Sequence, residues 1–250
     1  MQRTPFLKAM VGSHNYNLQV PESDKDYKFF VLPNFDDMYS NRDFAKSYQE
    51  ENGNDLEYKD ARQLPHLWWK TNVNFTEVLF SKEITTFDNT EIYVQLLLSY
   101  REEIARMNLP YLHRSTKGMM KTKVLKAEKG RRMEIYGGAD PDSKPWGKDI
   151  MTAYRIGDTF LRYHNNHFES FEEAFRYSND ERSTLLSLRN QEISYKEACD
   201  AVLEIEEKLK NLEFSYSEQD GLKTKQFVDD ILKQAVTNNL LREFNYLGTE

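Results

Sequence analysis

The sequence has little cysteine and no long apolar run. Its single cysteine, Cys199, excludes an internal disulfide and suits a reducing cytoplasm. No stretch of about 18 apolar residues occurs, and the N-terminus lacks the apolar core of a signal peptide. We therefore expect a cytoplasmic protein without a membrane anchor. Internal repeats, low-complexity segments and the spacing of zinc ligands are also missing.

Basic residues are fewer than acidic ones. The 34 Lys and Arg against 41 Asp and Glu give a net charge of −7, which argues against a broad, sequence-independent grip on nucleic acid. Lys and Arg nevertheless gather between Arg114 and Arg132, where Glu128 is the only acid. This stretch is either a solvated helix face or a contact for a phosphate-rich partner such as tRNA or another RNA.

Two aspartates, Asp24 and Asp26, come just before a β-prone run that ends at Pro33. That run predicts a strand from about Asp26 to Leu32. Side chains two residues apart on a strand share a face, so the two carboxylates are expected about 6–7 Å apart. A divalent cation, preferably Mg²⁺, would offset their repulsion. The alternative is that both acids are polar positions on the solvent face of an edge strand.

A turn at Gly12 and Ser13 comes before this acidic pair. Turns of this kind offer unpaired N–H groups and a hydroxyl to phosphate oxygens. A phosphate seat beside a metal-binding pair of carboxylates is typical of phosphoryl or nucleotidyl transfer.

The segment Gly12-Ser13-His14-Asn15-Tyr16-Asn17-Leu18, followed by Ser23-Asp24-Lys25-Asp26, resembles a known signature. It is similar to that of the polymerase-beta-type nucleotidyltransferase superfamily, and within it to the predicted bacterial and phage nucleotidyltransferases. Asn17 stands where that family usually has Gly. Asn is the best substitute for Gly at a left-handed position, so the turn is expected to survive. A Gly required by a nearby phosphate would instead mean altered or weaker nucleotide binding.

The third carboxylate of that family lies between two apolar residues on a neighbouring strand. The alternating run from Asp55 to Lys59 predicts such a strand, and Glu57 between Leu56 and Tyr58 matches the position. Asp55 shares the face of Glu57 and is the competing candidate. The resemblance implies that Asp24, Asp26 and Glu57 are catalytic and hold two Mg²⁺ ions, or Mn²⁺ in their place. It also implies that Gly12, Ser13 and Ser23 bind the nucleotide.

A second block of the family resembles the segment from Gly147 to Ile156. Lys148 and Arg155 are seven residues apart, so a helix would place them on one face, where the resemblance implies contacts with the triphosphate. Thr152 occupies the place of a family His. The alternative is that both are surface cations.

The fold expected is α+β, with a small mixed sheet in a nucleotidyltransferase core of residues 1–85 and a mostly helical region of residues 86–250 that completes the cleft. Asn74 is expected to cap a helix, with nucleotide binding as the alternative role, in an Asn72-Val73-Asn74 segment where the family usually has Pro in the middle. The other helices expected include one short helix near 41–50, in a long connection, and helices at 61–70, 114–134 with interruptions at Gly118 and Gly130, 195–212 and 224–244.

The resemblance implies an enzyme that transfers a nucleoside monophosphate, most simply AMP from ATP, to an acceptor hydroxyl and releases pyrophosphate. An RNA end, a protein side chain and a small molecule are all open as acceptors. The alternative is a catalytically silent relative that binds nucleotide or joins a toxin–antitoxin-type pair, which the departures at Asn17, Val73 and Thr152 favour. A scaffold protein built on the helical half is a third hypothesis.

Overall fold

The computed structural model describes residues 3–51, 53–137 and 145–247, and its contacts form two compact units. The sheet unit contains Met1–Asn15, Gln19–Asn108 and Ser217–Glu250, and the helical unit contains Tyr16–Leu18 and Leu109–Tyr216. The first segment of the chain in the helical unit is therefore only three residues long, Tyr16–Leu18. The division differs from the one expected after residue 85, because the helices between residues 91 and 106 and the C-terminal helix pack in the sheet unit.

A five-stranded mixed sheet, in the order β3-β4-β2-β1-β5, forms the framework of the sheet unit in the described part of the chain. The central strand β2 runs antiparallel to β1 and parallel to β4. The two edge strands, β3 and β5, are antiparallel to their neighbours. The α+β class is therefore confirmed. The strands are β1 (Thr4–Val11), β2 (Asp26–Leu32), β3 (Ala45–Gln49), β4 (Asp55–Asp60) and β5 (Ile84–Thr86).

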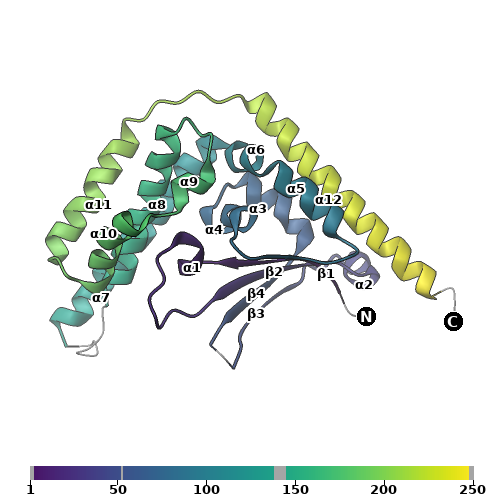
Figure 1. Ribbon diagram of the computed structural model, residues 1–250, viewed down its shortest axis with the longest axis horizontal. Coiled ribbons are helices and arrows are strands. Elements are labelled where there is room, and N and C mark those ends of the chain that lie inside the picture. The colour runs from purple at the N-terminus through teal and green to yellow at the C-terminus, as the bar shows by residue number, and fades with distance from the viewer. Residues whose placement is uncertain (1–2, 52, 138–144, 248–250) are drawn as a thin grey trace. The chain divides into compact units, whose positions relative to one another are not determined.

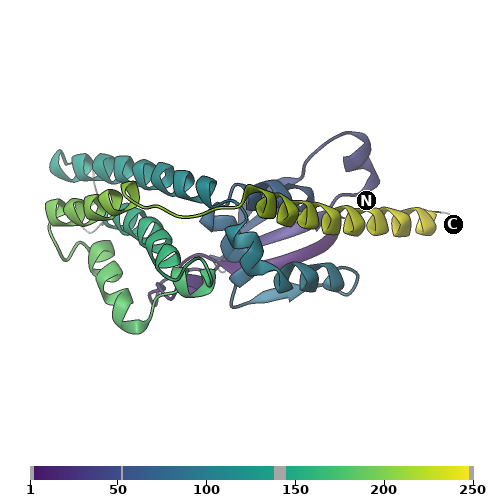
Figure 2. The same ribbon diagram turned by 90° about the horizontal axis from the view of Figure 1, so that it is seen from above.

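Helices of this unit lie over one face of the sheet (Figures 1 and 2). The covered face carries Leu7, Ala9 and Phe30, which are almost completely buried, because alternate residues of β1 and β2 point toward the helices. Trp68 and Phe80 complete this core from the helix side. The helices are α2 (Phe35–Tyr39), α3 (Leu64–Trp69), α4 (Val73–Thr76), α5 (Glu91–Ser99), α6 (Arg101–Arg106) and α12 (Glu218–Leu247), with 3-10 turns at Ala61–Gln63 and Glu77–Phe80.

The helical unit is built around α8, against which its other helices pack. The buried face of α8 carries Ile150, Phe160 and Tyr163 at helical spacing. The capping box of Ser194 and Glu197, expected from the sequence, begins α11. The helices are α7 (Leu109–Ile135), α8 (Gly147–Asn165), α9 (Phe171–Phe175), α10 (Asn179–Asn190) and α11 (Tyr195–Lys210).

Three local expectations are corrected. Helix α7 runs without interruption through both glycines, and Gly130 is needed because a Cβ there would collide with the backbone of Pro145. Residues 41–50 contain the edge strand β3 rather than a helix. All side chains of β3 are exposed, so the sequence has no apolar alternation there that would predict a strand. Asn72, not Asn74, caps α4, because its side chain accepts the Asn74 N–H at 3.0 Å. In the residues described, none of the helices has the length and apolar character that crossing a membrane requires.

Candidate metal centre

Three aspartates come together where β2 and β4 begin. Asp26 is the first residue of β2 and lies opposite Asp55, the first residue of β4, in the parallel register. Asp24 lies in the loop two residues before β2. One carboxylate oxygen from each of the three lies within 4.8 Å of those of the other two. Hard oxygen ligands gathered in this way suit Mg²⁺, which demands oxygen and keeps several waters or substrate phosphates in its shell.

Glu57 lies two residues further along β4, opposite Lys28, and is not one of the three acids in this cluster. Its carboxylate pairs with the Lys28 ammonium and lies 3.0 Å from the Nζ of Lys59. Burial raises the pKa of Glu57, but hydrogen bonds and charges from both lysines outweigh it and hold this pKa below its ordinary value. The expected placement of Glu57 beside Asp24 and Asp26 is therefore corrected. Asp55, the competing candidate, occupies that position.

Gly12 follows β1 directly and lies against the Asp26 carboxylate of the cluster. Its φ is +78°, in the left-handed region, and a Cβ added to it would collide with the carboxylate of Asp26. The Gly12 N–H donates to the Oε2 of Glu77 at 3.1 Å. This corrects the expectation that the Gly12 N–H is free for phosphate, since the buried Glu77 carboxylate requires hydrogen-bond donors of its own.

Glu77 is a residue of this site that sequence reasoning missed. It is only 2% exposed, and the Asn15 side-chain nitrogen donates both to its Oε2, at 3.4 Å, and to its backbone oxygen, at 3.3 Å. The Asn15 side-chain oxygen in turn accepts the Lys82 N–H at 3.2 Å. Glu77 and Asn15 therefore fix the turn after β1. No local pattern in the sequence places Glu77 here, since its partners Gly12 and Asn15 lie 65 and 62 residues away.

The two serines of the motif serve different purposes. The Ser23 hydroxyl accepts the Val20 N–H at 2.9 Å, and the Ser23 backbone oxygen lies 3.2 Å from the Nε2 of His14. Ser23 therefore orders the loop that leads to Asp24. Ser13 begins α1 (Ser13–Tyr16), and its half-buried hydroxyl makes no hydrogen bond within residues 3–51, 53–137 and 145–247.

Lys148 and Arg155 differ in exposure within the helical unit. Lys148 lies exposed in the first turn of α8, whereas Arg155 is buried and its guanidinium carbon lies 3.9 Å from the ring centre of Tyr16. Helix α8 contains both cations seven residues apart, as expected, but they differ in exposure because the Tyr16 ring covers Arg155. Thr152 donates a hydrogen bond to the backbone oxygen of Lys148 at 2.6 Å.

Asn17 has the left-handed backbone expected from the sequence. Its φ is +65°, so the expectation of a left-handed Asn is confirmed. The side-chain nitrogen donates to the backbone oxygen of Tyr177 at 2.8 Å and to the Oδ1 of Asn179 at 3.2 Å. These bonds anchor Tyr16–Leu18 in the helical unit.

Comparison of the chain with protein-family models gives no match, and neither does comparison with curated proteins.

Proposed function

We propose that this protein is a metal-dependent nucleotidyltransferase, which transfers a nucleoside monophosphate from an NTP, most simply ATP, to an acceptor hydroxyl. The observation that carries the proposal is the meeting of Asp24, Asp26 and Asp55 at one end of two parallel strands. The residues fit a divalent cation, because all three offer carboxylate oxygens and two of them are exposed. Lys25 lies 3.5 Å from Glu83, and Lys28 pairs with Glu57.

The protein groups would act by binding and positioning. When bound, Mg²⁺ or Mn²⁺ would neutralise triphosphate charge and lower the pKa of the acceptor hydroxyl. The β2–β4 ladder fixes where Asp26 and Asp55 begin, and Gly12 leaves space for the Asp26 carboxylate. The acceptor hydroxyl gives its proton to solvent water, its oxygen bonds to the α-phosphorus, the bond from that phosphorus to the bridging oxygen breaks, and pyrophosphate leaves. No covalent nucleophile of the protein is required.

The decisive experiment compares Asp55→Asn with Glu57→Gln, since both acids were candidates for one role. Mn²⁺ affinity is measured by titration, and transfer is measured with α-labelled ATP in the presence of RNA, protein and small-molecule fractions. Asp26→Asn and Asp55→Asn should weaken Mn²⁺ binding by at least about tenfold, because each removes a charged ligand. Glu57→Gln and the exposed control Asp88→Asn should stay near wild type. Transfer that survives Asp26→Asn would exclude the proposed chemistry.

A catalytically silent nucleotide-binding protein, alone or in a toxin–antitoxin-type pair, is the second candidate. It is favoured by the engagement of two expected phosphate contacts within the protein, namely the Gly12 N–H by Glu77 and Arg155 by Tyr16. Calorimetric titration with ATP, with and without Mg²⁺, separates the two functions when pyrophosphate release is followed in parallel. Binding without release in every acceptor fraction supports the silent protein.

A further inference from the structure

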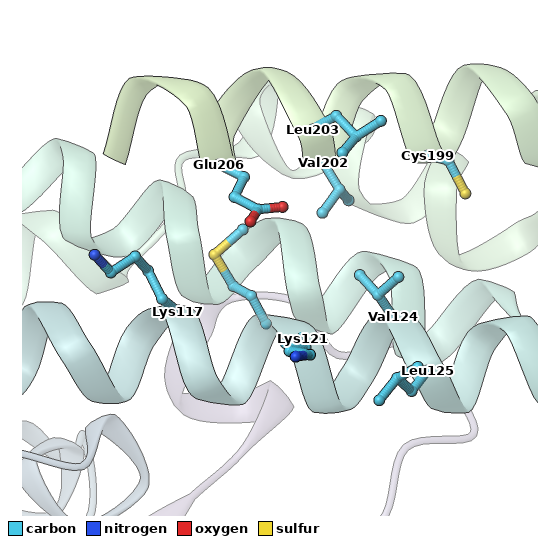
Figure 3. Close-up of a pocket in the computed structure, with 9 residues that line it drawn as sticks. Lys117, Lys121, Val124, Leu125, Cys199, Val202, Leu203 and Glu206 are labelled. Carbon is cyan, nitrogen blue, oxygen red and sulfur yellow. The ribbon is translucent and has the colours of Figure 1, made fainter. Parts of the chain in front are cut away.

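A hollow of about 370 Å³ lies between α7 and α11 of the helical unit (Figure 3). Pockets for small ligands begin at about this volume and are mostly apolar. Leu125 and Leu203 border the hollow and are 56% and 53% exposed, so an apolar ligand would cover side chains that water now reaches. The apolar lining consists of Met120, Val124, Leu125, Val202 and Leu203, with Cys199 beside them.

The charged groups of the hollow lie toward one end. Figure 3 shows Lys117 and Glu206 near that end, and Leu125 and Cys199 toward the other. Lys121 follows Lys117 by one helical turn. Neither ammonium has an ion pair or hydrogen bond with any residue of the described ranges. Two lysines against one glutamate leave a net charge of +1, and Glu206 also lies 3.9 Å from the Nζ of Lys210.

An elongated apolar space with one positive end fits a particular kind of ligand. From Lys117 to Leu125 the wall of α7 rises about 12 Å, at 1.5 Å per residue. We propose that this hollow binds a free alkanoate of medium chain length, with its carboxylate between Lys117 and Lys121 and its chain along Val124, Leu125 and Leu203. Glu206 would repel a doubly charged phosphate head more strongly than a singly charged carboxylate, and a neutral head would form no ion pair with either lysine. This inference does not depend on the proposed catalytic function.

Cys199 supplies the assay, because it lines the hollow and is the only cysteine in the chain. Its alkylation by iodoacetamide is followed at mildly alkaline pH, since burial raises the pKa of the Cys199 thiol. Decanoate, kept below its micelle concentration, should slow alkylation by about tenfold at saturation, when a chain shields the sulfur from reagent. Decyltrimethylammonium, with the same chain and the opposite charge, should leave the rate unchanged.

The head-group contact is tested with variants of α7. Lys117→Ala combined with Lys121→Ala should raise the decanoate concentration for half protection by about tenfold, because two exposed ion pairs are lost. Lys126→Ala is the matched control, since Lys126 is exposed on the same helix outside the hollow. Circular dichroism verifies that each variant is folded.

Three results with these probes would overturn the proposal. They are an alkylation rate that decanoate does not change, equal protection by the cationic analogue, and protection that the double variant of Lys117 and Lys121 leaves intact. Protection by an acidic amphipathic helical peptide, with none by decanoate, would assign the hollow to a protein partner instead and likewise overturn it.

Discussion

The segment from Gly12 to Leu18 has left-handed backbone at two positions, and the two units of the molecule accommodate them differently. Gly12, in the sheet unit, has φ +78° and lies against the carboxylate of Asp26. Asn17, in the helical unit, has φ +65° and uses its side chain to bond Tyr177 and Asn179. A positive φ alone therefore accepts Asn, whereas positive φ combined with close approach of a carboxylate requires Gly.

The largest effect should follow from Gly12→Ala. The left-handed backbone costs about 1–2 kcal/mol with a Cβ, and displacement of the Asp26 carboxylate adds about 1–3 kcal/mol, so we expect a loss of about 2–5 kcal/mol in the free energy of unfolding. Urea denaturation measures it. Gly53→Ala is the matched control, because Gly53 has φ +90° and nothing lies within 4 Å of an added Cβ. Equal losses in the two variants would show that the approach of Asp26 is not the cause.

Local features of this site could be read from the sequence, and long-range register could not. The strand Asp26–Leu32 and the left-handed Asn17 both depend on nearby residues, and both expectations are confirmed. The choice between Asp55 and Glu57 depends on how β4 aligns with β2, and the two share one face. Apolar flanks favoured Glu57, but the parallel ladder pairs Asp55 with Asp26.

Contacts between residues far apart along the chain could not be predicted from the sequence either. Glu77 bonds Gly12 across 65 residues, and nothing local to either one predicts the pair. The edge strand β3 was missed for a related reason, because its exposed side chains carry no apolar alternation. Its place is fixed only by pairing with β4.

Asp158 in the helical unit and Glu57 in the sheet unit should make the free energy of unfolding depend on pH in opposite directions. Burial raises the pKa of Asp158, which accepts the Tyr177 hydroxyl at 2.9 Å in the helical unit, whereas lysines lower that of Glu57 in the sheet unit. A carboxyl group whose pKa is higher in the folded state lowers the free energy of unfolding as the pH rises from its unfolded pKa to its folded pKa. A carboxyl group whose pKa is lower in the folded state contributes stability that is lost as the pH falls through its folded pKa.

Two variants test this difference by urea denaturation between pH values below and above the carboxyl range. Asp158→Asn keeps an acceptor for Tyr177 and should raise the free energy of unfolding at neutral pH, with the gain vanishing in acid. Glu57→Gln should lower it at neutral pH by about 1 kcal/mol or less, since solvent screens this half-exposed pair, and the loss should vanish in acid. Slopes of the same sign in both variants would contradict the opposite environments.

The smallest effect is expected from Asn17→Gly, which restores the residue of the resembled family. Gly relieves the left-handed strain but loses the hydrogen bond to the Tyr177 backbone oxygen, and each change is worth about 1 kcal/mol, so stability should stay within about 1 kcal/mol of wild type. Asn17→Ala loses the bond and keeps the strain, so it should be the less stable of the two by about 1 kcal/mol.

Asn17→Gly also distinguishes two reasons why the resembled family has Gly at this position. If only backbone conformation matters, Asn17→Gly leaves ATP affinity unchanged in calorimetric titration. A clear gain in affinity would mean that a phosphate approaches the backbone there, and that position 17, like position 12, is limited by space.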